Sequence, residues 1–424
     1  MELLPKTITR PVRRLGAAAQ NALEVARFGG LNTHDEASLY EVAAEHRVYR
    51  LRHYHAPSNG KAASRPPVLL VPPMMLAAEI YDVSPATSAV SILHEHGADP
   101  WVVDFGAPER EEGGLERTLA DHVVAISDAV DRVRAASGRD VHLGGYSQGG
   151  MFCYQTAAYR RGKGLSSLIT FGSPVDTRLG MPFGIPEQLA SGAANLLADR
   201  VFRAWALPAW ASRTGFRLLD PVKSARSRIE FLLQLHDREA LLPRERQRRF
   251  LEADGWVAWP GPAMADFLRQ FIAHNRMLEG GFVLDDRLLT LADIETPILS
   301  VLGSLDEIAP AAGVRAIRLA APRPDIYELC LKAGHFGLVV GSTSNAVTWP
   351  TVAEWVRWRD GDGERPEGLT EIPDDPAAQL AAVDGSRLPS RVGYGVELAG
   401  AVGTGVARSM AGTARRTVRG MREL

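Results

Sequence analysis

The sequence has 424 residues, of which 46% are hydrophobic and 23% charged, and a formal net charge of −2 at pH 7, so nothing in it predicts a nucleic-acid partner. Its two cysteines, Cys153 and Cys330, exclude a disulfide framework and are expected to be packing residues. The first residues lack the apolar core of a secretory signal, and no run of about 18 apolar residues predicts a membrane span, which makes a cytoplasmic location the default expectation.

The first part of the chain alternates strands and helices. Residues 1–45 are predicted to form a basic helical segment, with a helix from Leu15 to Phe28 that ends at two glycines. An antiparallel strand is expected at 48–54. Buried strands are expected at 66–73, 101–105 and 168–172 and just before Ser147, with helices at 119–135 and 151–161. This spacing predicts right-handed crossovers and a mostly parallel sheet, whose first part spans 46–173.

The alternation stops near Ser173. Residues 174–290 are rich in helix formers, tryptophan and arginine and contain no clear buried strand, so they are predicted to form a helical cap or lid. The core resumes over 291–359, with strands at 297–303 and 327–331 and a closing helix at 347–359. The cap is therefore inserted before the penultimate core strand. Residues 360–390 are interpreted as an acidic linker.

The final segment, 391–424, is basic and rich in small residues. Three interpretations stay open. With the basic N-terminal segment it could lie on a membrane, lipid-droplet or granule surface. It could equally be a frayed tail, or the lead-in to a separate partner domain.

The stretch from Gly145 to Gly149 is a Gly-x-Ser-x-Gly motif between an apolar run and an amphipathic run. Strand, sharp turn and helix are the setting of a nucleophile elbow, in which the turn presents the hydroxyl of Ser147 at the carboxyl edge of the sheet. The simpler alternative is an ordinary turn with a capping serine.

A serine nucleophile needs a base, and the base needs an orienting acid. In this architecture both follow later strands, in the order acid, then histidine. Asp306 comes just after the strand at 297–303, and His335 just after the strand at 327–331. Glu307 is the competing acid, but Asp306 is shorter and comes first. The predicted catalytic residues are therefore Ser147, Asp306 and His335.

An oxyanion hole requires two N–H donors. The backbone N–H of Gln148, at the start of the helix, is the first candidate. Because Pro72 and Pro73 have no N–H, Met74 is the first residue of its loop that can donate the second. Met75, Tyr146 and Phe336 are expected to contact substrate. No metal motif and no phosphate-binding loop of Walker type occurs, so no metal or cofactor is expected.

These motifs together resemble the polyhydroxyalkanoate synthase family, a branch of the α/β-hydrolases. The matching stretches are Leu70–Pro73, Val102–Phe105, Gly144–Gly150, Asp306–Pro310 and Gly334–Val340, within a match from about 48 to 358. The family's nucleophile is cysteine, where this chain has Ser147, and its usual tryptophan after the Asp-x-Ile-x-Pro motif is Ala311 here. The serine version resembles the lipase-type domain of actinobacterial bifunctional lipase/acyl-CoA synthetases, which implies an acyl-CoA synthetase as a possible partner.

The resemblance and the motifs together predict an α/β-hydrolase fold and a serine hydrolase of lipase, esterase or thioesterase type. Its substrates would be long-chain acyl or hydroxyacyl esters. One alternative is a synthase-like acyltransferase that uses acyl-CoA. Another is a lipid-droplet or granule surface protein whose triad has lost its function.

Overall fold

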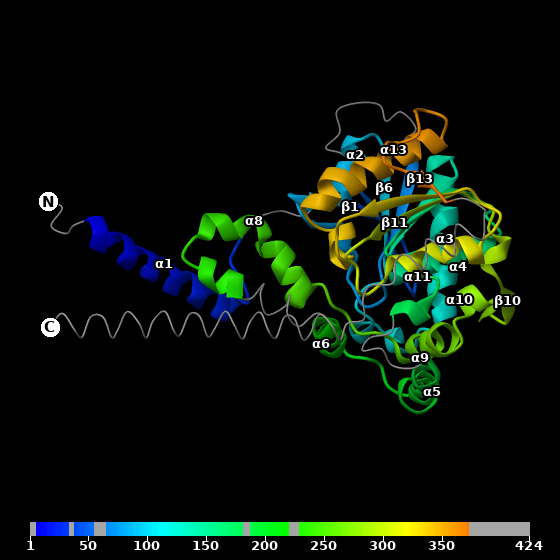
Figure 1. The fold of residues 1–424 in the computed structure, drawn as a ribbon, viewed down its shortest axis with the longest axis horizontal. Helices are drawn as coiled ribbons and strands as arrows, with labels where there is room; N and C mark the ends of the chain where they lie inside the picture. Colours follow the sequence, from blue (N-terminus) through cyan, green and yellow to red (C-terminus); the bar gives the residue numbers. More distant parts are fainter. Residues whose placement is uncertain (1–5, 34–37, 55–64, 181–186, 220–228, 373–424) are drawn as a thin grey trace, which may run out of the picture. The chain divides into compact units, whose positions relative to one another are not determined.

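The computed structural model describes residues 6–33, 38–54, 65–180, 187–219 and 229–372 (Figure 1). Its central feature is a nine-stranded sheet with the order β1-β2-β6-β3-β7-β8-β11-β12-β13. The strands are β1 (Tyr40–Glu45), β2 (Arg50–Tyr54), β3 (Pro67–Val71), β6 (Asp99–Asp104), β7 (Val141–Tyr146), β8 (Leu165–Phe171), β11 (Ile298–Gly303), β12 (Ile326–Leu331) and β13 (Thr370–Glu371). The six strands from β6 to β12 are parallel, and antiparallel strands close both edges. The predicted fold class is confirmed.

The middle strands are continuous apolar runs because helices cover both of their faces. Every residue of β3, β7 and β11 is buried. Two helix pairs flank the sheet: α2 (Ala89–Glu95) packs with α13 (Trp349–Arg359), and α3 (Leu119–Ser137) packs with α4 (Gln148–Arg160). The order of strands and helices thus brings the loops that follow β3, β7, β8, β11 and β12 to one edge.

Short elements join these layers. They are η1 (Ala78–Tyr81), β4 (Asp82–Ser84), β5 (Thr87–Ser88), η2 (Pro108–Arg110), η3 (Gly114–Glu116), η9 (Leu291–Asp293), α11 (Ala311–Arg315), α12 (Ile317–Ala320), η10 (His335–Leu338) and η11 (Ser344–Thr348).

The N-terminal region differs from the prediction at two boundaries. Helix α1 runs from Lys6 to Phe28, so it begins earlier than expected. The sheet begins at Tyr40 in β1, inside the range assigned to the helical segment 1–45. Five of the six residues of β1 are exposed. Because the strand buries so little, its sequence carries no alternation of apolar and polar residues that could have revealed it.

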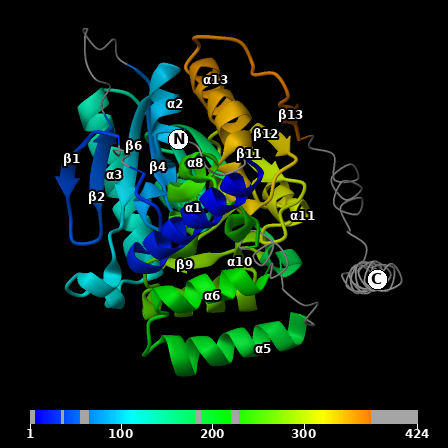
Figure 2. The ribbon, with the colours of Figure 1, turned by 90° about the vertical axis from the view of Figure 1, so that its left-hand side faces the viewer.

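Between β8 and β11 the described chain is mainly helical. The elements are η4 (Thr177–Gly180), α5 (Glu187–Leu197), η6 (Ala198–Phe202), α6 (Ala209–Leu219), α8 (Arg238–Arg249), η7 (Phe250–Asp254), α9 (Gly261–Phe267), η8 (Leu268–Ala273) and α10 (Arg276–Glu279). Helices α5 and α6 lie at the opposite end of the molecule from α2 and α13, as Figures 1 and 2 show.

The 174–290 region, predicted to be helical with no clear buried strand, also contains two short strands. A hairpin of β9 (Phe282–Leu284) and β10 (Arg287–Leu289) follows α10. Its turn residues, Asp285 and Asp286, have φ angles of 49° and 57°. This backbone conformation is the one that a two-residue hairpin needs, and aspartate tolerates it better than most residues. The Asp-Asp pair was the signal in the sequence.

The stretch assigned to an acidic linker, 360–390, is in part a component of the core domain. The carboxylate of Asp360 accepts a hydrogen bond from Arg139 and pairs with Nε2 of buried His142 at 3.1 Å. Thr370 and Glu371 then form β13 against Glu328 and Tyr327. Composition suggested a linker because it cannot tell a carboxylate with a buried partner from a solvated one. Residues 373–390 and the predicted basic segment 391–424 lie outside the described residues.

The expectation for the cysteines is half right. Cys153 is buried in α4, whereas Cys330 is exposed near the end of β12. Strand β13 pairs with β12 only at Tyr327 and Glu328, so among the described residues no strand pairs with the carboxyl half of β12 on that side.

His122 is a buried histidine that should make stability depend on pH. It lies 1% exposed between Phe105 and Phe152, and its Nδ1 is 2.7 Å from the carbonyl oxygen of Thr118. Burial, with a smaller contribution from Arg117, lowers the pKa of His122 from 6.5 to about 4.

The folded protein therefore binds fewer protons than the unfolded chain between about pH 4 and 6.5, and acid favours unfolding in this window. We expect His122→Phe to reduce the slope of unfolding free energy against pH by about 1.4 kcal/mol per pH unit there. Urea titrations at half-unit pH steps measure the slope, with exposed His96→Gln as the control. Equal slopes in the wild type and the His122 variant would contradict the assignment.

Candidate active site

The turn between β7 and α4 places Ser147 at the carboxyl edge of the sheet. Ser147 has φ 54° and ψ −119°, a strained conformation for a residue with a side chain. A Cβ on Gly145 would lie 2.4 Å from the carbonyl of Gly149, and one on Gly149 would lie 2.1 Å from the carbonyl oxygen of Val71. Neither distance is possible for real atoms, so the motif needs both glycines to let the turn approach β3.

The structure brings Ser147, Asp306 and His335 together from three separate strand ends. Nε2 of His335 is 2.9 Å from Oγ of Ser147, and Nδ1 of His335 is 2.7 Å from Oδ2 of Asp306. Asp306 and His335 are 3% and 6% exposed. The other oxygen of Asp306 accepts the backbone N–H groups of Ile308 and Ala309, each at 2.9 Å, which fixes the carboxylate plane. Glu307, the competing acid, points to the surface.

Gly172, directly after β8, is a residue of this site that the sequence analysis missed. It has φ 54°, and a Cβ there would lie 3.1 Å from both Oδ2 of Asp306 and Nδ1 of His335. A larger residue would push against the hydrogen bond between acid and base. The available signal was its position, a glycine at the carboxyl end of a buried strand next to the elbow strand.

Tyr81 is a second residue that the sequence analysis missed. Its hydroxyl donates to the carbonyl oxygen of Val71 at 2.7 Å and accepts the backbone N–H of Tyr146 at 3.0 Å. It therefore ties the ends of β3 and β7, the strands that lead to the Met74 loop and to Ser147. The side chain is fully buried, and burial raises the pKa of its hydroxyl well above 10. Nothing in the local sequence marks it, because the bond spans 65 residues.

The ring of Tyr146 packs beneath the imidazole, with 4.9 Å between its centroid and that of His335. Tyr146 is 1% exposed, so in this structure it supports His335 and offers substrate no open surface. Burial, followed by the nearby carboxylate of Asp306, raises the pKa of Tyr146 well above 10 and keeps the phenol neutral.

One of the two expected oxyanion donors already has a hydrogen-bond acceptor. Helix α4 begins at Gln148, so the helix itself does not use the backbone N–H of that residue. The backbone N–H of Met74 donates to Oε1 of the Gln148 side chain at 3.2 Å. Nε2 of the same amide is buried and has no partner among the described residues. A substrate oxygen would therefore have to replace the Gln148 side chain at Met74.

Of the residues expected to contact substrate, Phe336 lies beside the triad, with 6.2 Å between the centroid of its ring and that of His335. Met75 is buried, and its contact with substrate stays a prediction. The carbonyl of Met75 accepts the N–H of Val257 at 3.0 Å. The ring of Trp256 meets that of Phe336 edge to face, with 6.5 Å between centroids. On the other side, Trp256 borders a cavity of about 380 Å³ that is also lined by Glu109, Pro208, Ala209, Trp210, Arg213, Ala253 and Ala258.

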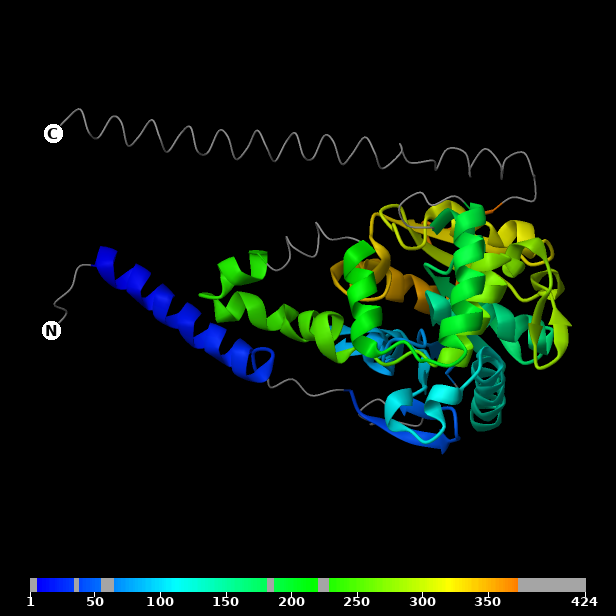
Figure 3. The ribbon, with the colours of Figure 1, turned by 90° about the horizontal axis from the view of Figure 1, so that it is seen from below.

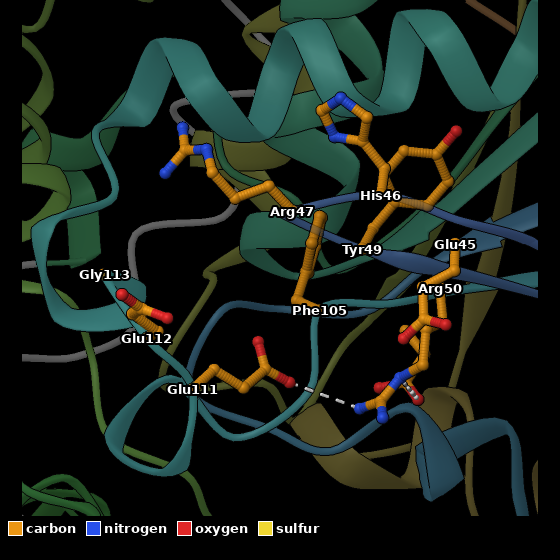
Figure 4. Close-up of a pocket in the computed structure, with 10 residues that line it drawn as sticks. Glu45, His46, Arg47, Tyr49, Arg50, Phe105, Glu111, Glu112 and Gly113 are labelled. Atoms are coloured by element: carbon orange, nitrogen blue, oxygen red, sulfur yellow. Dashed lines mark hydrogen bonds and ion pairs between the residues drawn. The ribbon is translucent and has the colours of Figure 1, made fainter.

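A second cavity, of about 750 Å³, lies between the β1–β2 turn and the loop after β6 (Figure 4). Its arginines already have acidic partners. Arg50 pairs with Asp104 and Glu111, and Arg47 pairs with Asp121. None of the lining residues has a described contact with Ser147, Asp306 or His335, so this cavity is not part of the candidate site.

The described residues contain no group of three or more His, Cys, Asp or Glu side chains that could hold a metal ion. None of their helices combines the length and apolar character that crossing a membrane requires.

The bridge made by Tyr81 yields a prediction. Tyr81→Phe leaves the buried carbonyl of Val71 and the N–H of Tyr146 without this partner, which should cost about 1–3 kcal/mol of unfolding free energy. Because the bridge positions the turn that carries Ser147, turnover of a soluble ester should also fall. Tyr154→Phe is the matched control: its hydroxyl is equally buried, but it bonds the side chain of Thr170 and does not link the strand ends at Val71 and Tyr146. Chemical denaturation and initial rates are measured on both variants, and equal loss of turnover in the two would reject a positioning role.

Comparison with known proteins agrees with this geometry. No family model matches the sequence. The chain is 28% identical over 367 residues to the poly(3-hydroxyalkanoate) polymerase subunit PhaC of Haloferax mediterranei, covering 85% of this chain and 71% of the relative. It is 26% identical to the subunit of the same name from Allochromatium vinosum, covering 85% and 99%. Among solved structures, a soluble variant of the Saccharomyces cerevisiae monoglyceride lipase shares the fold at a TM-score of 0.50 and 13% identity, covering 78% of this chain and 98% of the lipase. The chain is therefore an enzyme with the α/β-hydrolase fold, and its sequence is similar to those of polyhydroxyalkanoate polymerase subunits.

Proposed function

We propose that the protein is a serine hydrolase that cleaves long-chain acyl or hydroxyacyl esters or thioesters through an acyl-enzyme on Ser147. The observation that carries the proposal is the continuous hydrogen-bonded series from Asp306 through His335 to Ser147, at 2.7 and 2.9 Å. In a serine hydrolase this series lets the imidazole take the hydroxyl proton as the oxygen attacks the carbonyl carbon.

Each residue of the series has a separate task. Nδ1–H of His335 donates to Asp306, which leaves Nε2 free to accept the proton of Ser147. The carboxylate stabilises the imidazolium that forms, and its bonds from Ile308 and Ala309 prevent it from rotating. The same imidazolium then protonates the leaving group, and a water activated by His335 releases the acid from Ser147.

Apolar groups near the triad support the proposed substrate class. Phe336 contacts both His335 and Trp256, and the cavity that Trp256 borders is mostly apolar except for Glu109 and Arg213. Apolar walls with few polar groups suit an acyl chain better than a peptide or a sugar.

The synthase-like alternative is a transacylation in which an incoming hydroxyacyl group, not water, takes the acyl chain. The names of the relatives favour it, since each is a polymerase subunit. Serine argues against it. A thiolate is a good nucleophile and a good leaving group, whereas an oxygen ester on Ser147 is more stable and is normally discharged to water or an alcohol.

The triad is tested by removing its members singly and together. Ser147→Ala should lower kcat for a p-nitrophenyl ester by a factor on the order of 10⁶, His335→Ala by a similar factor, and the double variant by little more, because the residues act as one unit. A fluorophosphonate probe should label the wild type and not Ser147→Ala. If the two losses multiply in the double variant, the assignment is rejected. It is also rejected if the probe labels a known serine hydrolase but not the wild-type protein.

The Ser147→Cys variant tests whether the protein acts as a hydrolase or as a synthase. Asp306 and His335 should still activate the thiol, so labelling by thiol-reactive acyl analogues should appear. Ester hydrolysis should fall by roughly 10²-fold, because the larger sulfur displaces the reacting carbon by about 1 Å from the oxyanion donors. The assay compares polymer formation with release of free CoA on a 3-hydroxyacyl-CoA. We expect release without polymer, and polymer made by the wild type would favour the synthase instead.

A further inference from the structure

Helix α1 and the residues from 229 to 249 form a small helical pair with a core of its own. Its buried members are Leu31, Leu235 and Leu241, and the partly buried residues packed on them are Ala18, Ala22, Val25, Phe231 and Leu242. Polar contacts join the two parts: Nδ2 of Asn21 donates to the carbonyl of Leu235 at 2.7 Å, and Arg238 pairs with Glu24. Figures 1 and 3 show α1 running beside α8.

This pairing uses one face of α1, and the described part of the chain does not cover a second apolar face of the helix. Leu15, Ala19 and Leu23 follow one another at four-residue intervals, so they form one row on the helix. Leu15 and Leu23 are 71% and 69% exposed. The opposite member of the pair also exposes large apolar side chains, Ile229, Leu232 and Leu233. Such a concentration of exposed leucine and isoleucine in so small a unit is typical of a docking surface.

The charge of α1 indicates what this surface meets. The helix contains Lys6, Arg10, Arg13, Arg14 and Arg27 but a single acidic residue, Glu24. Glu24 is already paired with Arg238. Arg14 and Arg27 are exposed. Arg14 directly precedes Leu15, and Arg27 lies four residues after Leu23. An apolar row with arginines beside it and no free carboxylate on the helix suits an anionic surface and disfavours a second copy of the same basic helix.

We propose that the row of Leu15, Ala19 and Leu23 on α1 docks the protein on an anionic lipid surface, with the leucines entering the acyl boundary and Arg14 and Arg27 meeting lipid phosphates. This role is separate from the chemistry of Ser147. If the proposed function holds, docking would bring the enzyme to the lipid surface in which long-chain acyl substrates accumulate.

The test is co-sedimentation of the full chain with vesicles of phosphatidylcholine alone and with 30% phosphatidylglycerol, which is about the content at which surface charge attracts basic helices. We expect binding to the anionic vesicles that weakens as salt rises. Leu15→Ser/Leu23→Ser should weaken it at least about tenfold. Arg14→Gln/Arg27→Gln should weaken it and flatten its salt dependence. Leu288→Ser is the matched control, since Leu288 is 73% exposed on the β9–β10 hairpin.

All three variants should keep the wild-type rate on a short soluble ester and the wild-type melting temperature, because the changed side chains are exposed and outside the candidate site. Unchanged vesicle binding in Leu15→Ser/Leu23→Ser would overturn the proposal, and so would equal binding to neutral and anionic vesicles. If that variant instead converts a dimer to a monomer, with no vesicle binding by the wild type, the row is a contact between copies. None of these outcomes depends on whether Ser147 is catalytic.

Discussion

The close approach of the β7–α4 turn to β3 is the constraint on which the candidate site depends. No side-chain carbon fits between Gly149 and the carbonyl of Val71, and Ser147 can hold a φ of 54° only while the turn is pressed there. Conformations of this kind cost about 1–3 kcal/mol and persist only where the surroundings over-determine them. Here the surroundings are the parallel pairing of β3 with β7 and the hydroxyl of Tyr81 that spans both strand ends. The backbone conformation of Ser147 is thus maintained by the pairing of β3 with β7, and the five-residue motif alone would not maintain it.

The proteins that this chain is similar to carry the names of two different activities. The chain is similar in sequence to polymerase subunits and shares the fold of a monoglyceride lipase. The synthase family that it resembles uses a cysteine nucleophile, whereas this chain has Ser147. In the proposed reaction, the oxygen ester on Ser147 would resist exchange more than a thioester does, and the product would depend on whether water or another acyl group reaches the carbonyl. Similarity of fold does not decide between these outcomes, because the reaction depends on the groups at the site.

The sequence was sufficient for the parts of this protein that have local signatures. Buried strands read as apolar runs, and the acid and histidine could be placed because each directly follows such a run. It was insufficient where a residue acts across the fold. Tyr81 and Gly172 belong to the site through contacts with residues far along the chain, and β1 buries too little to show an alternating pattern. Asp360 was interpreted as linker because its partner His142 lies 218 residues away. The sequence gives the type of each residue, whereas these roles depend on its contacts with residues distant in the chain.

The contact between Met74 and Gln148 has a consequence for selectivity between reaction stages. In the resting protein a neutral amide oxygen already sits on the Met74 N–H. A substrate carbonyl that took its place would exchange one neutral acceptor for another and gain little. In the proposed reaction the tetrahedral intermediate would carry a full negative charge on the corresponding oxygen, and a charged acceptor bonds an N–H roughly twice as strongly as a neutral one. Displacing the Gln148 oxygen would cost the same free energy in the ground state and in the transition state. The Gln148 side chain would therefore weaken substrate binding without reducing the additional stabilisation of the charged intermediate.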